Sequence, residues 1–254
     1  MWVAATTLLI ASLQDNPKPT PVDRSGEGYL AKLLDSYSKL PPFYLWFDRY
    51  SRDTDSSGFE KSGTAQLWYG GGKKFRLYSM GQFGDGMLNV CDGDTWLRDP
   101  LDLSQPVELD AAPKTWQAMY PQASPNQNGC LIFWLMDGKA SLNDLAEKDK
   151  PITMLRKGNA MVVSFTNKSV GKIQIEIVEG WLSASEFVSS FDFDGTHFEF
   201  ISRDEYKPFV FGSRFDRGTF DVTPGKGVRI QDLRKKKPAT SGLAARAGVA
   251  GSDH

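Results

Sequence analysis

The chain has 254 residues, with 30 Lys and Arg residues against 31 Asp and Glu residues, and 40% of its residues are hydrophobic. This length suffices for one large or two small domains with a buried core. The net charge of −1 gives no electrostatic reason to expect a nucleic-acid partner. With only two histidines, His197 and the terminal His254, a metal site built from several histidines is excluded. We expect no cofactor.

The first residues are typical of an export signal. Residues 2–13 form an apolar run that is too short to span a bilayer but has the length of a signal-peptide core. A buried first strand or helix is the alternative. No cysteine follows this run to accept a lipid anchor. We therefore expect residues 1–26 to be a cleaved signal peptide and flexible leader. We also expect the protein to be periplasmic or otherwise exported, and to have no transmembrane segment.

The first half of the chain predicts one helix and then a series of strands. Between residues 27 and 40 the apolar residues recur at steps of three and four, which indicates one stripe of an amphipathic helix. Pro41 and Pro42 end that helix. Gly and Asp turns then separate short runs with the alternation of strands. The expected strands are 43–52, 63–69, 74–80, 87–91 and 95–98.

The first of these strands carries apolar bulk on both faces. Phe43, Leu45 and Phe47 share one face, and Tyr44 and Trp46 share the other. We expect a strand that is buried on both sides, or one whose outer face packs beneath the first helix.

The second half of the chain predicts short helices and then strands again. The apolar block 131–136 and the segment that opens at Ser141 are expected to be short helices on the sheet. The strands expected after them are 152–155, 160–165, 172–178 and a segment from Phe187 onward. Residues 231–254 are basic and rich in small residues, which indicates a disordered tail. Between the leader and this tail we expect a single domain over residues 27–230, in which the sheet curves around the helices.

Asp194-Gly195 gives the strongest hairpin signal in the chain. A two-residue loop there pairs Phe191 with Phe198 and places Asp192 opposite His197. In this register Phe191, Phe193, Phe198 and Phe200 share one face of the hairpin.

Candidate catalytic groups are few. His197, the only internal histidine, faces Asp192 in the expected hairpin and could be a general base, but no Ser or Cys nucleophile motif accompanies it. A cross-strand ion pair at the surface explains the same two residues. The carboxylate pairs Glu176 with Glu179, and Asp192 with Asp194, are compatible with a glycosidase only at a suitable separation in space.

Other short motifs have structural explanations. Asp92-Gly93-Asp94 begins like a calcium loop, but Trp96 and Arg98 occupy further ligand positions, so we expect a tight turn. The glycine-rich segment 70–73 lies between two strands and opens no helix, so we expect a hairpin tip and no phosphate site. Cys91 and Cys130 are either a disulfide or two buried thiols.

One part of the chain resembles a known family. Residues 63–69 (GTAQLWY), Phe75 and residues 90–100 (VCDGDTWLRDP) resemble the periplasmic lipoprotein carriers of the LolA type and their uncharacterised relatives. Residues 105–109 fit the strand that follows in that family, and residues 36–40 fit the end of its leading helix. The resemblance covers residues 27–200 and is most specific over residues 63–109.

The resemblance implies an α+β fold in which a curved antiparallel sheet forms an unclosed half-barrel covered by short helices. It also implies an apolar cavity for acyl chains between sheet and helices. The ligand-binding residues expected on this basis are Trp46, Trp68, Phe75, Leu77, Leu88, Val90, Trp96, Phe133, Trp134 and Met136, the last three on a lid helix.

The chain departs from the family at one place. Between the Leu-Trp and the Phe, carriers of the Lol pathway have an Arg-Pro whose arginine holds the lid closed, whereas this chain has Gly71-Gly72. Lys73 cannot replace a bidentate guanidinium. The departure therefore bears on the shuttle function more than on the fold.

The leading hypothesis is an exported, monomeric, non-enzymatic carrier or sensor that binds lipid or lipoprotein acyl chains. A membrane-associated donor or acceptor protein would be its partner. The alternatives are a scaffold or interaction module of the same fold, filled by its own aromatic residues, and a hydrolase that uses His197.

Overall fold

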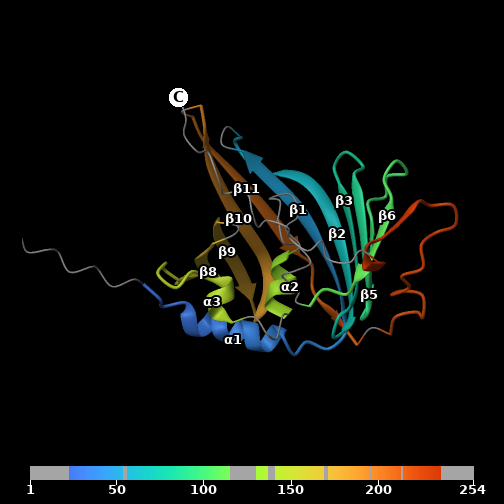
Figure 1. The fold of residues 1–254 in the computed structure, drawn as a ribbon. Helices are drawn as coiled ribbons and strands as arrows, with labels where there is room; N and C mark the ends of the chain where they lie inside the picture. The colour runs from blue at the N-terminus through green and yellow to red at the C-terminus, as the bar shows by residue number, and fades with distance from the viewer. Residues whose placement is uncertain are drawn as a thin grey trace, which may run out of the picture.

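A single sheet forms the body of the protein (Figure 1). The computed structural model describes residues 23–53, 56–114, 130–136, 141–168, 171–194, 196–212 and 214–235. Over these residues the chain forms a 13-stranded sheet and short helices on one side of it. The expected curved, unclosed half-barrel covered by short helices is confirmed.

Most of the expected elements are present with nearly the expected bounds. The helices are α1 (Glu27–Tyr37), α2 (Cys130–Met136) and α3 (Leu142–Leu145), with a 3₁₀ turn η2 at Leu233–Lys235. The strands of the first half are β1 (Phe43–Asp53), β2 (Glu60–Gly71), β3 (Lys74–Gly81), β4 (Gly86–Asp92), β5 (Thr95–Asp99) and β6 (Val107–Ala111). Those of the second half are β7 (Thr153–Lys157), β8 (Ala160–Asn167), β9 (Gly171–Val178), β10 (Trp181–Phe193), β11 (Thr196–Tyr206), β12 (Val210–Phe211) and β13 (Ile230–Asp232).

The sheet joins two meanders through one long-range pairing. Its strand order is β13-β6-β5-β4-β3-β2-β1-β11-β10-β9-β8-β7, and β12 pairs with the start of β1. The pairing of β1 with β11 brings the two halves of the chain together, and β7 and β13 form the ends. Every pairing is antiparallel except that of β13 with β6. Because β7 and β13 do not pair with each other, the barrel stays open.

Two boundaries differ from the sequence prediction. β10 begins at Trp181, earlier than the expected start at Phe187, because its first residues pair with the end of β9. β13 lies across the expected end of the domain at residue 230. Residues 1–22 and 236–254 lie outside the described residues, so the signal peptide, the leader and the disordered tail stay predictions.

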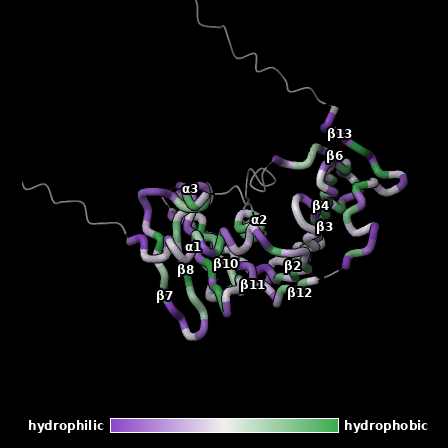
Figure 2. The backbone as a smooth tube through the Cα atoms, turned by 90° about the horizontal axis from the view of Figure 1, so that it is seen from below, coloured by the Kyte–Doolittle hydropathy of each residue, from purple (hydrophilic) through white to green (hydrophobic). Residues whose placement is uncertain are grey.

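The apolar side chains of strand β1 are fully buried on one face only, which corrects the expectation for this strand. Phe43, Leu45 and Phe47 are fully buried, whereas Trp46 on the opposite face is 40% exposed. The first helix packs against the Phe43 face and leaves the Trp46 face uncovered. The reason is that all three helices lie on the inner side of the curved sheet, as Figure 2 shows.

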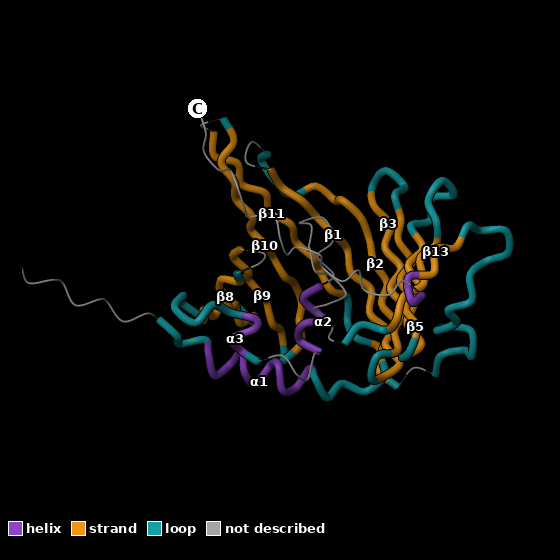
Figure 3. The backbone as a smooth tube through the Cα atoms, in the orientation of Figure 1, coloured by secondary structure: helices purple, strands orange, loops and turns teal. Residues whose placement is uncertain are grey.

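Helix α1 is fixed on this inner side by its apolar stripe and by one hydrogen bond. Leu30, Leu33, Leu34 and Tyr37 are buried at the three- and four-residue steps that the sequence predicts. The hydroxyl of Tyr37 accepts a hydrogen bond of 2.7 Å from the backbone N–H of Leu182 in β10. The helices lie over the lower part of the sheet in Figure 3, and β1, β10 and β11 continue beyond them.

Two hydrophobic clusters lie on opposite faces of the sheet. The larger one joins the concave face to all three helices. The smaller one lies on the convex face of β4, β5 and β6, where the later chain covers it. Its members are Val90, Leu97, Val107 and Leu109, with Leu88, Val222 and Val228 packed against them.

Candidate ligand-binding face

The concave face beneath the helices is an apolar surface built from aligned strands. In one row across the sheet, Leu45 of β1 pairs with Leu67 of β2, which pairs with Leu77 of β3. The side chains of all three are buried. The next row towards the start of β1 is aromatic, since Phe43 pairs with Tyr69, and Tyr69 pairs with Phe75. Strand alternation therefore gathers apolar side chains from distant parts of the sequence on one curved surface.

Helix α2 covers this surface with a stretch of entirely apolar residues. The side chains of residues 131–136 (LIFWLM) are all buried, on every side of the helix. The ring of Phe133 packs edge-on against Phe75, with a centroid separation of 5.4 Å. A helix that is apolar all round requires a buried environment.

The structure brings together only part of the expected ligand-binding set. The expected residues in the concave cluster are Phe75, Leu77, Trp96, Phe133, Trp134 and Met136. Leu88 and Val90 instead belong to the smaller cluster on the convex face.

The two remaining residues, Trp46 and Trp68, lie on the outer face of β1 and β2. Trp68 stacks at a tilt against Tyr44, with ring centroids 5.2 Å apart, and the guanidinium of Arg76 lies 5.8 Å from its ring centroid. The alternation of β1 and β2 explains this placement, because Trp46 and Trp68 are each one residue away from an inward-facing leucine.

Beyond the apolar rows, the concave face carries a polar cluster that the sequence analysis did not single out. Arg49 of β1 pairs in register with Asp204 of β11, and Ser202 lies two residues before Asp204 on the same face. The side chains of Arg49 and Asp204 are 14% and 1% exposed, and Ser202 is 6% exposed. We call Arg49, Asp204 and Ser202 the inner polar cluster.

The polar atoms of the inner polar cluster are incompletely satisfied. Arg49 Nε lies 3.5 Å from Asp204 Oδ1, longer than a charge-assisted hydrogen bond. Arg49 Nε, Asp204 Oδ2 and Ser202 Oγ are buried and have no hydrogen-bond partner among the residues that the structure describes. Burial raises the pKa of Asp204 to about 6, against the opposing effect of the Arg49 charge. Buried polar groups are normally hydrogen-bonded, so three such atoms at adjoining positions of β1 and β11 are unusual.

A hydroxyl pair adjoins the inner polar cluster. Ser185 Oγ and Tyr206 OH are 3.0 Å apart, and both residues are buried. Burial raises the pKa of Tyr206 well above its usual value, which keeps this hydroxyl neutral. The Tyr206 ring packs on Phe47 at 5.2 Å between centroids. The pair thus lies where the apolar rows give way to the polar cluster.

One sequence signal could have found the inner polar cluster. Phe43, Leu45, Phe47 and Arg49 follow one another at steps of two, which places a charged residue at the end of an inward-facing apolar series. Asp204 lacks a comparable local signal, because its partner in β1 is distant in sequence.

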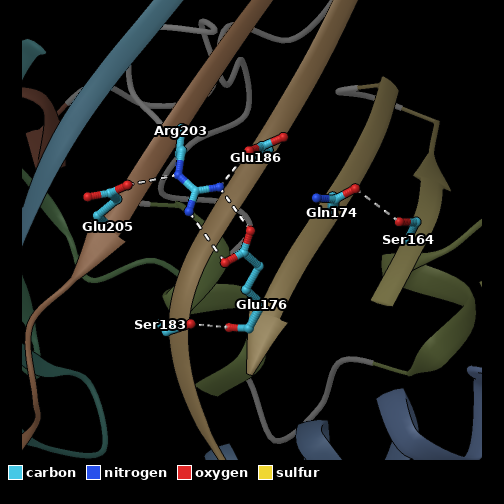
Figure 4. A network of polar contacts seen from close by, with 7 residues as sticks. All are labelled: Ser164, Gln174, Glu176, Ser183, Glu186, Arg203 and Glu205. Carbon is cyan, nitrogen blue, oxygen red and sulfur yellow. Dashed lines mark hydrogen bonds and ion pairs between the residues drawn. The ribbon is translucent and has the colours of Figure 1, made fainter. Parts of the chain in front are cut away.

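A second arginine cluster lies on the convex face of β9, β10 and β11 (Figure 4). Arg203 contacts Glu186 at 2.5 Å, and Glu176 and Glu205 at 3.0 Å each. Burial lowers the pKa of Arg203, but its hydrogen bonds to the three carboxylates outweigh that effect and hold the pKa above its usual value. We call Arg203, Glu176, Glu186 and Glu205 the outer ion cluster.

Among the candidate catalytic groups, the pair of His197 and Asp192 lies at the surface. His197 Nδ1 lies 2.8 Å from Asp192 Oδ1, as the expected hairpin register predicts, and these side chains are 63% and 80% exposed. Glu176 belongs to the outer ion cluster, and Glu179 lies at a turn with a φ of 51°. In the described part of the chain, no group of three or more His, Cys, Asp or Glu side chains could hold a metal ion.

The remaining motifs have the structural roles expected for them. Asp92 Oδ1 accepts hydrogen bonds from the backbone N–H groups of Asp94 and Thr95, which makes the Asp-Gly segment a tight turn. Gly71 and Gly72, with φ of 94° and 59°, form the hairpin tip between β2 and β3. Cys91 is a buried free thiol, and burial raises its pKa, so it is not a reactive thiolate. No helix within the described residues is long and apolar enough to cross a membrane.

Comparison with known proteins gives matches among solved structures only. No family model matches the sequence, and no curated protein matches it. An uncharacterised conserved protein from Thermus thermophilus is 6% identical, over 82% of this chain and 99% of its own, with a TM-score of 0.43. A DUF1329 family protein from Desulfovibrio piger is 11% identical, over 79% of this chain and 98% of its own, with a TM-score of 0.36. A LolA superfamily protein from Nitrosomonas europaea is 10% identical, over 76% of this chain and 97% of its own, with a TM-score of 0.33.

Proposed function

We propose that the protein is an exported, non-enzymatic carrier or sensor that holds an acyl chain of a lipid or lipoprotein between α2 and the concave face of the sheet. The observation that carries this proposal is the wholly apolar helix α2, which lies over an equally apolar concave surface of an open sheet. Burial of an acyl chain there contributes about 0.8 kcal/mol for each CH₂ group. The bound chain needs no covalent chemistry from the protein.

The size and position of α2 support this role. It has only seven residues, none of them charged, and it contacts α1. Its contacts with the concave face are therefore apolar, and an acyl chain can replace them with contacts of the same kind. Gly71 and Gly72 stand where Lol-pathway carriers have the lid-holding arginine, so this chain would release its lid by another route.

Extraction of lipid from the purified protein tests the proposal directly. We expect mass spectrometry of the extract to show acyl lipids in stoichiometric amount, and delipidated protein to bind 11-(dansylamino)undecanoic acid. Protein that yields no lipid and does not bind the probe contradicts the carrier function.

A substitution on the concave face tests where the chain binds. Ala65 of β2 is fully buried between Phe47 and Ser79 in register. In Ala65→Phe we expect the new ring to occupy the space of the ligand and to abolish probe binding with little change in stability. Thr64→Phe, on the convex face of the same strand, is the matched control and should bind the probe as the unmodified protein does.

A filled-core scaffold or interaction module has its own supporting observation. Phe47, Phe75 and Phe133 are fully buried by the protein's own side chains. In such a core Ala65→Phe overpacks the interior and lowers the free energy of unfolding by about 1–3 kcal/mol. Denaturant unfolding of this variant, together with the probe titration, separates the two functions.

The cellular setting is part of the same proposal. A protein that carries acyl chains in an exported compartment receives them from, and delivers them to, a membrane-associated donor or acceptor protein. We propose that it does so as a monomer, and sedimentation of the delipidated and loaded protein tests this state.

A further inference from the structure

We infer that the inner polar cluster of Arg49, Asp204 and Ser202 binds the uncharged polar head of the acyl ligand, a head that both donates and accepts hydrogen bonds. The inference rests on the proposed function and names its ligand class: a neutral acyl lipid with hydroxyl or amide groups, such as a monoacylglycerol. The geometry of three unpaired buried atoms carries it.

The unpaired atoms specify complementary hydrogen-bonding groups. Arg49 Nε–H is a donor, Asp204 Oδ2 is an acceptor, and Ser202 Oγ can be either. A ligand that satisfies all three needs at least one acceptor and one O–H or N–H donor. A glycerol or amide head has both, whereas an ester oxygen alone or a hydrocarbon has not.

The charges of the inner polar cluster favour an uncharged head. Arg49 and Asp204 carry opposite charges 3.5 Å apart, so their fields largely cancel for a ligand that touches both. An anionic head would meet the buried carboxylate of Asp204, and a cationic head would meet the guanidinium of Arg49. Either one would bring a further charge into a buried site, which costs free energy.

The position of the cluster fits a ligand with a polar end and an apolar end. Along β1, Arg49 follows Phe43, Leu45 and Phe47 on the same face, so the polar groups lie at the end of the apolar rows. The partner of Arg49 in β2 is Gly63, which has no side chain to cover the guanidinium. The Arg49 side chain is 14% exposed, so the described residues do not cover this end of the apolar surface completely.

The test compares three ligands with one chain and different heads. Each displaces methyl 11-(dansylamino)undecanoate, an uncharged probe, from the delipidated full-length protein: 1-monooleoylglycerol, methyl oleate and oleate. We expect monooleoylglycerol to displace the probe at a concentration at least tenfold lower than methyl oleate, which has no donor, and lower than oleate, which is charged.

Substitutions then assign this preference to the cluster. Ser202→Ala and Asp204→Asn should each reduce the tenfold preference to less than threefold, while methyl oleate displaces the probe as before. Ser164→Ala is the matched control, because Ser164 lies on the convex face of β8, where its hydroxyl contacts Gln174. It should keep the full preference.

Each other outcome overturns the inference in an identifiable way. Equal displacement by all three ligands, or an unchanged preference in both variants, overturns the head-group site and leaves the carrier function standing. Tightest displacement by oleate shows that the cluster selects an anionic head. Failure of the probe and all three ligands to bind overturns the carrier function, and the head-group site with it.

Discussion

The inner polar cluster and the outer ion cluster lie on opposite faces of the sheet at β11, and they differ in how completely their charged groups are paired. Arg203 and Asp204 are neighbours in β11, so their side chains point to opposite sides of the sheet. On the convex side Arg203 contacts three carboxylates. On the concave side, within the described part of the chain, Asp204 has Arg49 as its one ion-pair partner, at 3.5 Å, and one oxygen without a hydrogen bond.

This difference indicates different roles for the two clusters. The outer ion cluster satisfies its arginine with protein side chains alone and holds β9, β10 and β11 together. The inner polar cluster leaves buried hydrogen-bonding capacity unused, which lowers stability unless something else fills it.

The largest expected loss of stability comes from a substitution in the apolar part of the concave face, and the losses expected in the two clusters are smaller. Phe75→Ala removes a fully buried ring that packs on Phe133. We expect the free energy of unfolding to fall by about 3–5 kcal/mol in urea titrations. Phe75→Leu, which keeps more of the volume, should cost clearly less. Equal and small losses in both variants would show that this part of the face is not packed core.

Asp204 of the inner polar cluster should make the free energy of unfolding depend on pH. The folded pKa of Asp204, about 6, lies above its ordinary value of 3.8, so between these values the folded protein binds more protons than the unfolded chain. This group therefore lowers the free energy of unfolding as the pH rises from about 4 to 7, by roughly 3 kcal/mol. The charged or titratable neighbours are Arg49 and Tyr206, and Tyr206 stays neutral in this range.

Asp204→Asn isolates that contribution. The variant should gain stability relative to the unmodified protein as the pH rises through this range, measured by denaturant unfolding at several pH values. A difference between the two proteins that does not change with pH contradicts the burial of an ionisable carboxyl at this position.

The outer ion cluster should contribute to stability through its arginine. Arg203→Gln leaves Glu176, Glu186 and Glu205 facing one another, and we expect the free energy of unfolding to fall by about 2 kcal/mol at pH 7.5. The loss should shrink at high salt, because salt screens the repulsion between the carboxylates. Adding Glu186→Gln should restore part of the stability. A loss that the second substitution deepens would show that Glu186 has a role independent of Arg203.

The smallest effect is expected at the exposed pair of His197 and Asp192. Because both side chains are largely exposed, His197→Ala should change the free energy of unfolding by no more than about 0.5 kcal/mol. Any hydrolytic activity found in a preparation should be unchanged in this variant. Loss of such an activity would revive the hydrolase hypothesis.

The sequence predicted the local structure well where alternation and turn residues agree. The register of the β10–β11 hairpin, with Asp192 opposite His197, follows from Asp194-Gly195 alone. The helical stripe of α1 and the strand β3 were likewise predictable, because each depends on periodicity within a short segment. The end of the sheet at β13 was not, since its pairing with β6 joins residues far apart in sequence.

The sequence predicted the composition of the concave face less completely, for a related reason. Alternation shows that Leu45 and Trp46 face opposite sides, but it does not show which side the helices cover. Trp46 was therefore expected at the ligand although it lies on the uncovered convex face. The same ambiguity placed Leu88 and Val90 with Phe75, whereas the register of β3 with β4 puts them on the other face.

By itself, the sequence determined the type and order of the elements, because hydrophobic periodicity, glycine turns and prolines act over a few residues. Only the tertiary structure decided which face of the sheet became the interior, since that depends on where α1, α2 and α3 pack. It also decided that Arg49 meets Asp204, because the pairing of β1 with β11 brings together two residues that no local pattern connects.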